Sequence, residues 1–267
     1  MPSSGESRLG EQFSLSVMCG HCSCGEPSAP EPSTSRHGRQ VTLEEGLLSR
    51  NDHLAAHNRE HFRAAGVRVV NLLSSPGSGK TALLERLAAL APPSLRLAAL
   101  VGDLATDNDA RRLQEAGLPA VQITTGQACH LEAAMVHRGL AALAAAGYPL
   151  ASLDLLLIEN VGNLVCPAAF DLGEDLRLVL LSVTEGEDKP LKYSATFHSA
   201  DLVVISKSDL AEAVDFDRPL ATRNVRQVAP AARVLEVSAR RGTGLEALLE
   251  ALLLPRTAPT AATLAAG

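Results

Sequence analysis

Short apolar runs alternate with helix-length segments from Val67 onward, and this alternation limits the folds open to the chain. The apolar runs predict seven strands, at residues 67–73, 95–101, 119–123, 153–159, 176–183, 201–206 and 233–237. Segments of helical length separate most of them, such as residues 80–91, 106–116 and 128–146. Strands that are apolar throughout and separated by helices are typical of a parallel sheet covered on both faces. We therefore predict an α/β fold, with a mostly parallel sheet and a ligand at the carboxyl ends of its strands.

The flanking segments differ in composition from this region. Residues 1–41 are rich in Ser, Pro and Gly, include "EPSAPEPSTS", and are expected to form a flexible, disordered leader. A helix is predicted over residues 42–65, with Thr42 as its cap, Glu45 completing a capping box and Gly66 ending it. The main domain is therefore expected to span residues 42–254, and the Pro-, Thr- and Ala-rich residues 255–267 are expected to fray.

Three histidines recur in the predicted first helix at His53, His57 and His61. This spacing of four places them on one helical face, where they could form a metal-binding stripe. Because Asn, Arg and Glu lie among them, we interpret this face as a solvated polar surface.

The stretch "SSPGSGKT" at residues 74–81 follows the first predicted strand and opens a helix, which is the context of a phosphate-binding loop. Gly77 and Gly79 allow backbone N–H groups to face phosphate oxygens, Lys80 supplies a positive charge, and the Thr81 hydroxyl can bind Mg²⁺. The usual first glycine of the motif is replaced by Ser74. The residues expected to bind the phosphates are Gly77, Ser78, Gly79, Lys80, Thr81 and Ala82.

Two acidic residues follow later strands. Asp103 lies in "VGDLATDND", and Glu159 ends the strand "LDLLLIEN". A carboxylate beside a phosphate loop suits Mg²⁺ binding, so both are expected to act with Lys80 in catalysis and with Thr81 in holding Mg²⁺. For Asp103, a simple role at a helix N-terminus is the alternative.

A guanine-binding element is indicated by "ISKSDL" at residues 205–210. Asp209 can accept hydrogen bonds from the guanine N1–H and exocyclic amine, and the stem of Lys207 can lie along the ring. Ser206 stands where Asn is usual. "VSAR" at residues 237–240, with Ser238 and Ala239 as expected nucleotide-binding residues, indicates a loop that covers the guanine carbonyl through the Ala239 backbone N–H. Guanine is therefore favoured over adenine.

All five cysteines fall into two groups. Cys19, Cys22 and Cys24 form a C-x-x-C-x-C cluster around His21. The second group is Cys129, beside His130, and Cys166, in two segments that are expected to leave the sheet on its ligand side. Thiolate and imidazole donors suit Ni²⁺, Zn²⁺ or Cu. The second group offers three ligands and leaves a position for water or a partner. The alternative is that Cys166 is a buried apolar residue and His130 a capping residue.

Composition sets limits on function. The net charge of −6 argues against a nucleic-acid partner, and no apolar run approaches the roughly 20 residues that span a bilayer. The first residues lack the pattern of a secretory signal, so we expect a cytoplasmic location, where clustered cysteines are more often metal ligands than disulfides.

Several of these motifs together resemble a known family, the nickel-incorporation GTPases of [NiFe]-hydrogenase maturation, or HypB. The resemblance runs from Cys19 to about residue 250 and rests on the C-x-x-C-x-C cluster, "SSPGSGKT", "NDA", "CHL", "IENVGNLVCPA" and "LSVTEGEDKPLKY". The family also carries Ser at the position of Ser74, whereas Ser206 departs from its usual form.

This resemblance implies a P-loop NTPase fold with a SIMIBI-type G domain, GTP hydrolysis and dimerisation through that domain. It also implies work with the hydrogenase zinc/nickel chaperone HypA and delivery of Ni²⁺ to the hydrogenase large subunit. GTP or GDP, Mg²⁺ and Ni²⁺ are the expected cofactors and cargo, with Zn²⁺ as an alternative at the G-domain site. Carried over by residue, Cys19, Cys22 and Cys24 form one nickel site, and Cys129, His130 and Cys166 form the G-domain site. Since Glu159 and Cys166 share one short segment, loss of the γ-phosphate is expected to alter the metal site.

Other interpretations remain open at the level of sequence. They are a urease-accessory nickel GTPase, a passive nickel store with a weak nucleotide switch, and a GTPase chaperone for a cobalamin enzyme. The leading cysteines and the intact phosphate loop favour the hydrogenase interpretation. Met18 directly precedes Cys19 as an initiator would, so the fourth donor of the leader site is expected to be either His21 or a free Cys19 amine.

Overall fold

The computed structural model describes the backbone of residues 36–254 and the side chains of residues 46–254. The predicted cluster of Cys19, Cys22 and Cys24, together with His21, lies outside the described residues, as does the predicted tail at residues 255–267.

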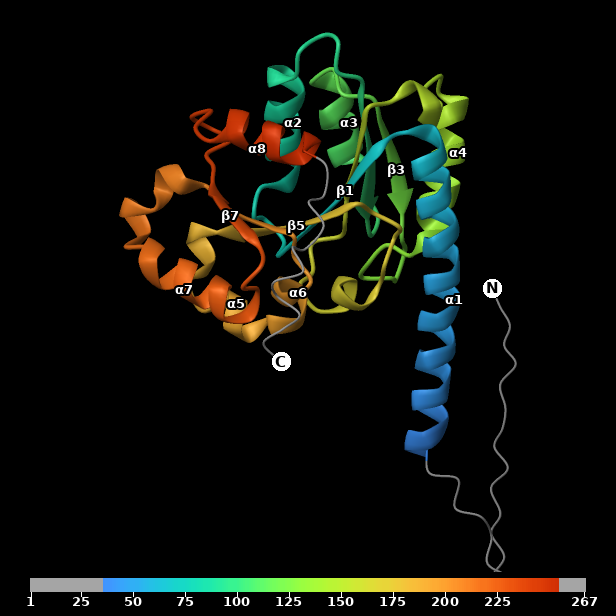
Figure 1. Ribbon diagram of the computed structural model, residues 1–267, viewed down its shortest axis with the longest axis horizontal. Helices are drawn as coiled ribbons and strands as arrows, with labels where there is room; N and C mark the ends of the chain where they lie inside the picture. The colour runs from blue at the N-terminus through green and yellow to red at the C-terminus, as the bar shows by residue number, and fades with distance from the viewer. Residues whose placement is uncertain (1–35, 255–267) are drawn as a thin grey trace, which may run out of the picture.

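A seven-stranded sheet forms the centre of the described structure (Figure 1). Its strand order is β3-β2-β4-β1-β5-β6-β7, and every neighbouring pair is parallel. The strands are β1 (Arg68–Ser74), β2 (Leu97–Asp103), β3 (Ala120–Thr124), β4 (Leu155–Glu159), β5 (Leu176–Ser182), β6 (Leu202–Ser206) and β7 (Arg233–Glu236). The predicted parallel α/β fold is confirmed.

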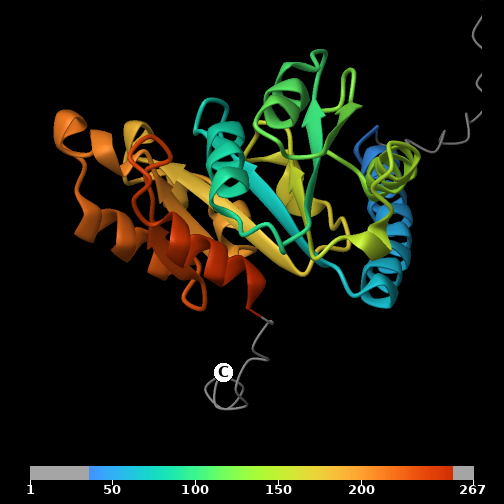
Figure 2. The same ribbon diagram turned by 90° about the horizontal axis from the view of Figure 1, so that it is seen from above.

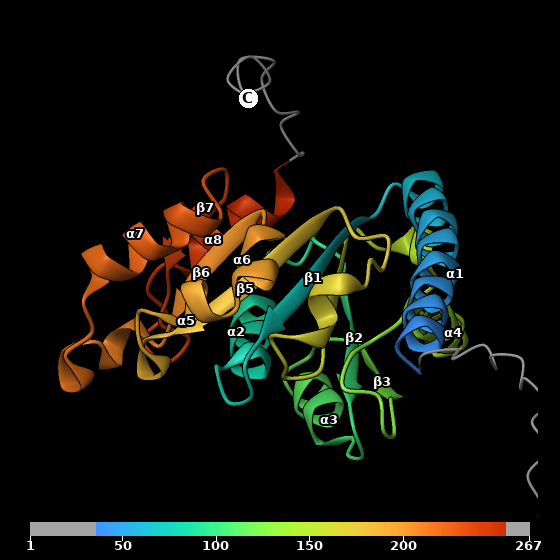
Figure 3. The same cartoon turned by 90° about the horizontal axis from the view of Figure 1, so that it is seen from below.

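Helices cover both faces of this sheet (Figures 2 and 3). One face carries α2, α3 and α8, and the other carries α1, α4, α6 and α7. The helices are α1 (Arg36–Ala65), α2 (Lys80–Leu90), α3 (Asn108–Glu115), α4 (Ala133–Ala145), α5 (Lys189–Lys192), α6 (Ser194–His198), α7 (Arg218–Val228) and α8 (Leu245–Leu253). Short 3-10 turns lie at η1 (Leu150–Ser152), η2 (Cys166–Ala169), η3 (Val183–Glu185), η4 (Ser208–Leu210) and η5 (Glu212–Val214). Among residues 36–254, no helix has the length and apolar character needed to cross a bilayer.

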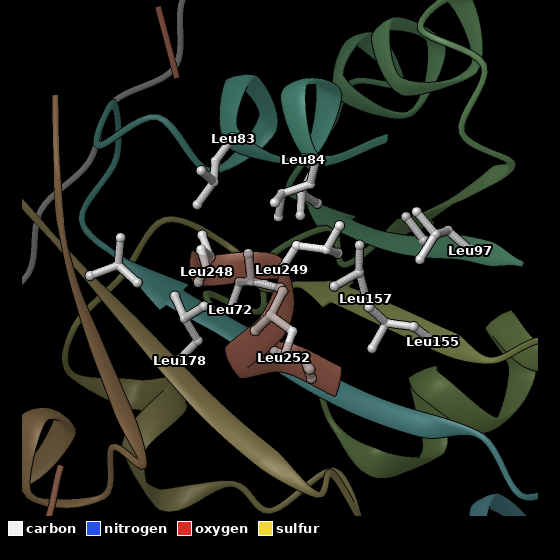
Figure 4. Close-up of a cluster of buried hydrophobic side chains, with 14 of the residues drawn as sticks. Leu72, Leu83, Leu84, Leu97, Leu155, Leu157, Leu178, Leu248, Leu249 and Leu252 are labelled. Atoms are coloured by element: carbon white, nitrogen blue, oxygen red, sulfur yellow. The ribbon is translucent and has the colours of Figure 1, made fainter. Parts of the chain in front are cut away.

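Leucines dominate the core between the sheet and the helices α2 and α8. Figure 4 shows side chains from α2, α8 and four strands meeting there, namely Leu72, Leu83, Leu84, Leu97, Leu155, Leu157, Leu178, Leu248, Leu249 and Leu252. Each buried leucine contributes roughly 1.5–3 kcal/mol of hydrophobic stabilisation. This packing fixes α2, and therefore the loop that precedes α2, against the sheet.

The first helix is longer than its sequence signals indicate. It begins at Arg36, so Thr42 lies inside the helix and the predicted N-terminal cap is wrong. A capping box is a local signal that does not exclude an earlier start. Because residues 33–41 contain no proline, the helix can begin upstream of Thr42. The predicted end is confirmed: Gly66 follows Ala65 with a φ of 69°, and Val67 N–H donates to the carbonyl of Phe62.

The helix predicted over residues 128–146 begins only at Ala133. Tertiary hydrogen bonds hold the preceding residues in turns, because the Asn160 side-chain oxygen accepts from Leu131 N–H at 3.0 Å. Asn51 on α1 accepts from Ala133 N–H at 2.9 Å and satisfies one of the free donors at the start of α4. Cys129 and His130 therefore lie in a turn before α4.

Candidate functional site

The phosphate loop joins the end of β1 to the start of α2. Gly77 has a φ of 73° and Gly79 a φ of 98°, which are left-handed conformations that other residues rarely adopt. Gly79 directly precedes the first residue of α2, so free backbone N–H groups and the positive end of the helix dipole face the loop. This geometry suits a phosphate group.

Ser74 and Lys80 are buried and paired. The Lys80 ammonium donates to Ser74 Oγ at 2.9 Å, and that hydroxyl donates to the Ser75 carbonyl at 2.8 Å. Burial lowers the pKa of Lys80, and the nearby Glu159 and Asp109 carboxylates oppose this effect. Ser74 is the last residue of β1, and its backbone does not have the positive φ that would require glycine.

Glu159, at the end of β4, lies beside the start of α2. The Thr81 hydroxyl donates to Glu159 Oε1 at 2.8 Å, whereas Oε2 is buried and has no hydrogen-bond partner within residues 46–254. Burial raises the pKa of Glu159 to about 7 despite the nearby Lys80. A hydroxyl and a carboxylate with an unpaired oxygen fit the hard oxygen donors that Mg²⁺ prefers.

Asp103 occupies the end of β2, but its carboxylate bonds to its own loop. Its Oδ1 accepts from the backbone N–H groups of Ala105 and Thr106, each at 2.9 Å. Burial raises the pKa of Asp103, and these hydrogen bonds outweigh that effect and lower it overall. The structure does not bring the Asp103 side chain into hydrogen-bond contact with Lys80 or Thr81. Its predicted Mg²⁺ role therefore remains a prediction.

Asp109 is an acidic residue near the loop to which the sequence analysis assigned no role. It lies in the first turn of α3, and its charge acts on both Lys80 and Glu159. The sequence signal for it is the "TDNDA" stretch after β2, which also contains Asp107, and the pattern alone does not distinguish these two acids.

A pocket of about 190 Å³ adjoins the phosphate loop and brings the predicted base-binding residues together. The Ser238 hydroxyl donates to Asp209 Oδ1 at 2.6 Å, and this bond lowers the pKa of Asp209. Asp209 therefore offers an ionised carboxylate, as guanine N–H groups require. The lining residues are Ser78, Gly79, Ala82, Leu83, Ser206, Lys207, Asp209, Leu210, Val237, Ala239 and Arg240.

Ser206 and Lys207 tie this pocket to the phosphate loop. The Ser206 hydroxyl donates to the Ser78 carbonyl at 2.8 Å, and the Lys207 ammonium donates to the Gly77 carbonyl at 2.6 Å. Lys207 has a left-handed backbone with a φ of 57°. The serine at this position thus still links the two loops through one hydrogen bond.

Beyond the carboxyl ends of β3 and β4, the structure brings together Cys129, His130 and Cys166. One ligand atom from each lies within 4.8 Å of the others, and all three residues are half-buried. His130 Nε2 is buried without a hydrogen-bond partner within residues 46–254. The neighbouring Cys166 thiol raises the pKa of Cys129, and burial lowers the pKa of His130. An unpaired imidazole nitrogen beside two thiols fits a soft or borderline metal ion.

Two neighbours of this cluster carry no signal in the sequence. The Phe170 ring lies 3.8 Å from the His130 ring, centroid to centroid, and the Asn163 amide donates to the Cys129 carbonyl at 3.2 Å. Both contacts depend on the path of the chain after β4, which residue spacing does not determine.

The segment from Glu159 to Cys166 contacts both sites. Asn163 forms an isolated β-bridge with Ser74 of the phosphate loop and also contacts Cys129. A Cβ atom added to Gly162 would lie 2.9 Å from Pro76 Cα, so the segment lies directly against the phosphate loop. One short segment therefore contacts both the phosphate loop and the cysteine and histidine cluster.

The family profile and the sequence relatives that match this chain point to the same group of proteins. Residues 68–236 match the family profile described as CobW/HypB/UreG, nucleotide-binding domain. The chain is 49% identical over 230 residues to hydrogenase maturation factor HypB of Azotobacter vinelandii, covering 84% of this chain and 72% of the relative. It is 43% identical to HypB of Escherichia coli (strain K12), covering 89% of this chain and 80% of the relative.

Solved structures agree with the sequence relatives. A crystal structure of HypB from Helicobacter pylori in complex with nickel matches with a TM-score of 0.73 and 43% identity, covering 76% of this chain and 94% of that one. HypB from Archaeoglobus fulgidus matches with a TM-score of 0.70 and 40% identity, covering 76% and 97%. The predicted P-loop NTPase class is confirmed, and the chain belongs to the HypB family within the CobW/HypB/UreG nucleotide-binding domains.

Proposed function

We propose that this protein is a GTPase whose nucleotide state controls the binding and release of Ni²⁺ during [NiFe]-hydrogenase maturation. The observation that carries this proposal is the segment from Glu159 to Cys166, which contacts the phosphate loop at one end and supplies a thiol at the other. Relatives named hydrogenase maturation factor and a relative crystallised with nickel support the same conclusion.

The residues around the phosphate loop have distinct roles in this proposal. Lys80 neutralises charge on the phosphates, and its pairing with Ser74 holds its ammonium group in the loop. Thr81 and Glu159 hold Mg²⁺, which supplies charge stabilisation to the transferred phosphoryl group. Asp209, oriented by Ser238, accepts the guanine N–H groups. Asp103, at the end of β2, contributes negative charge near Lys80.

Cys129, His130 and Cys166 hold the Ni²⁺ cargo or Zn²⁺. When the γ-phosphate leaves, the loop around Pro76 relaxes, and the adjoining segment moves Asn163 and Cys166 relative to Cys129. A metal site with only three protein ligands is sensitive to such a shift, because the lost contact is not replaced from within the site. Release to a hydrogenase large subunit follows, with a HypA-type chaperone and a second copy of this chain as the expected partners.

The test is a titration of the full chain with Ni²⁺ and with Zn²⁺, once in GDP and once in a non-hydrolysable GTP analogue. We expect the affinity of the Cys129–His130–Cys166 site to differ several-fold between the two nucleotides. Lys80→Ala should abolish GTP turnover and remove that difference, whereas Lys192→Ala, an exposed lysine paired with Asp188, should change neither. Normal turnover in Lys80→Ala contradicts the assignment of the loop, and equal metal affinities in the wild type contradict the coupling.

A further inference from the structure

Helices α1 and α4 lie side by side (Figures 1 and 3). Three exposed histidines, two on α1 and one on α4, lie close together there. The ring centroids of His57 and His61 lie 4.4 Å apart. The centroid of the His137 ring lies 5.7 Å from that of His57 and 5.9 Å from that of His61. One nitrogen from each ring lies within 4.8 Å of the other two. The helical spacing of His57 and His61 is therefore completed from a second helix.

The helices that carry these rings are held rigidly together. Asn51 accepts from Ala133 N–H at 2.9 Å, and Asn58 donates to the Ala133 carbonyl at 2.9 Å. Phe62 and Val136 are buried in one hydrophobic cluster beneath the histidines. Since both helices are fixed by buried contacts, the three imidazoles start close together and need only side-chain rotation to converge.

The distances are within reach of a single ion. Imidazole nitrogens bind Zn²⁺ at about 2.0–2.1 Å, which places two ligand atoms of a tetrahedral site about 3.4 Å apart. The three nitrogens must therefore close by at most about 1.4 Å from the present 4.8 Å. Exposed histidines can make this movement without disturbing the core.

The chemistry of the donors selects the ion. Three imidazoles without a carboxylate favour borderline divalent transition metals over Mg²⁺ or Ca²⁺, which require oxygen ligands. The three residues are exposed, so an ion bound by them would keep coordination positions for water and would exchange readily.

We propose that His57, His61 and His137 form an additional, solvent-open site for a borderline divalent cation such as Ni²⁺ or Zn²⁺. It is separate from the cysteine-containing cluster, because it consists only of imidazoles and lies on the exposed side of α1 and α4. The site loads and unloads metal by exchange with solvent, and it neither requires a nucleotide nor responds to one. It stands independently of the proposed GTPase function.

The test uses the full chain without a polyhistidine tag, in a background in which Cys19, Cys22, Cys24, Cys129 and Cys166 are replaced by serine. Equilibrium dialysis against Ni²⁺ should show one bound ion per chain that excess Mg²⁺ does not displace. His137→Ala and His61→Ala should each weaken this binding tenfold or more. His53→Ala is the matched control, since His53 is exposed one turn earlier on the same helix but lies outside the cluster. Circular dichroism of every variant checks that the fold is retained.

Protection from diethylpyrocarbonate gives a second measurement in the protein with its native cysteines. Ni²⁺ should slow modification of His57, His61 and His137 together and leave His53 and His198 unchanged, as read by peptide mass spectrometry. Loss of binding in His53→Ala equal to that in His137→Ala contradicts the assignment of the ligands. Absence of bound Ni²⁺ in the cysteine-free background, or lack of protection of His137, overturns the site.

Discussion

Asp209 is the residue on which base selectivity is expected to depend. Guanine presents two N–H donors to a carboxylate, whereas xanthine presents one donor and one acceptor, which an amide can match. We therefore expect Asp209→Asn to weaken GTP binding and to favour xanthosine triphosphate. Nucleotide competition measured by fluorescence checks both effects.

Ser238→Ala is the control for this change. It removes the hydroxyl that donates to Asp209 Oδ1 and accepts from Arg241 N–H. GTP affinity should therefore fall by about 1 kcal/mol without a change of base preference. Equal wild-type affinity for ATP and GTP contradicts the guanine assignment.

Glu159 is expected to make the nucleotide-free protein less stable as the pH rises. Burial raises its pKa from 4.5 to about 7, so between these values the folded protein keeps a proton that the unfolded chain has lost. The unfolded state therefore binds fewer protons, and the free energy of unfolding falls by about 3 kcal/mol as the pH rises through this range. Urea denaturation at pH 5, 6, 7 and 8 without Mg²⁺ measures this dependence.

Glu159→Gln removes the titrating group while keeping its shape. The difference in unfolding free energy between this variant and the wild type should grow from pH 5 to pH 8. Subtracting the two curves removes contributions from other groups, such as His130, whose pKa is lowered by burial. A constant difference across the range would show that Glu159 is ionised throughout.

At the scale of single elements, the segment between β4 and η2 is the connection between the two sites. Asn163→Ala removes the side-chain bond to the Cys129 carbonyl and the acceptor of Val165 N–H, and it keeps Lys80, Thr81 and both cysteines. We expect each site to bind its own ligand, but the difference in metal affinity between GDP and the GTP analogue should shrink at least twofold. Isothermal titration of metal in each nucleotide state measures this difference.

Gln114→Ala provides the matched control, because its amide donates to the carbonyl of Ala120 at the amino end of β3, away from both sites. It should leave the nucleotide dependence intact. Unchanged coupling in Asn163→Ala would assign the transmission to another path.

The strands could be predicted from the sequence because each one is a run of apolar residues between turn signals. Their observed ends differ from the predicted ends by two residues at most. The starts of α1 and α4 could not. The beginning of α4 depends on side chains of Asn51 and Asn160, which come from distant parts of the chain. The proximity of His137 to His57 could not be predicted for the same reason, since it depends on how α4 packs against α1.

For the candidate site, the order of the motifs and their positions at strand ends were sufficient to place them together at the carboxyl ends of the strands. In a parallel sheet all carboxyl ends point the same way, so Glu159, Ser206 and the phosphate loop had to meet there. Side-chain directions were not predictable. Asp103 is the last residue of β2, close to its expected position, yet its Oδ1 accepts from the backbone N–H groups of Ala105 and Thr106.

At the scale of the whole molecule, the metal cluster is expected to control association of two copies. Three donors within 4.8 Å leave at least one coordination position open, and a second copy can supply a ligand. Val165, directly before Cys166, has 64% of its surface exposed, so a second copy that supplies a ligand to the metal would come close to this side chain.

We therefore expect Ni²⁺ or Zn²⁺ to lower the dissociation constant of the dimer at least tenfold, as measured by sedimentation equilibrium. Cys129→Ala and Cys166→Ala should each abolish this effect, and the double variant should lose no more, because all three residues hold one ion. Val165→Asp should weaken the dimer while preserving metal binding to the monomer. Leu47→Asp changes an apolar side chain of similar exposure (62%) on α1 and should have no effect. Additive losses from the two cysteines, or a dimer indifferent to metal, would mean that the copies associate through another surface.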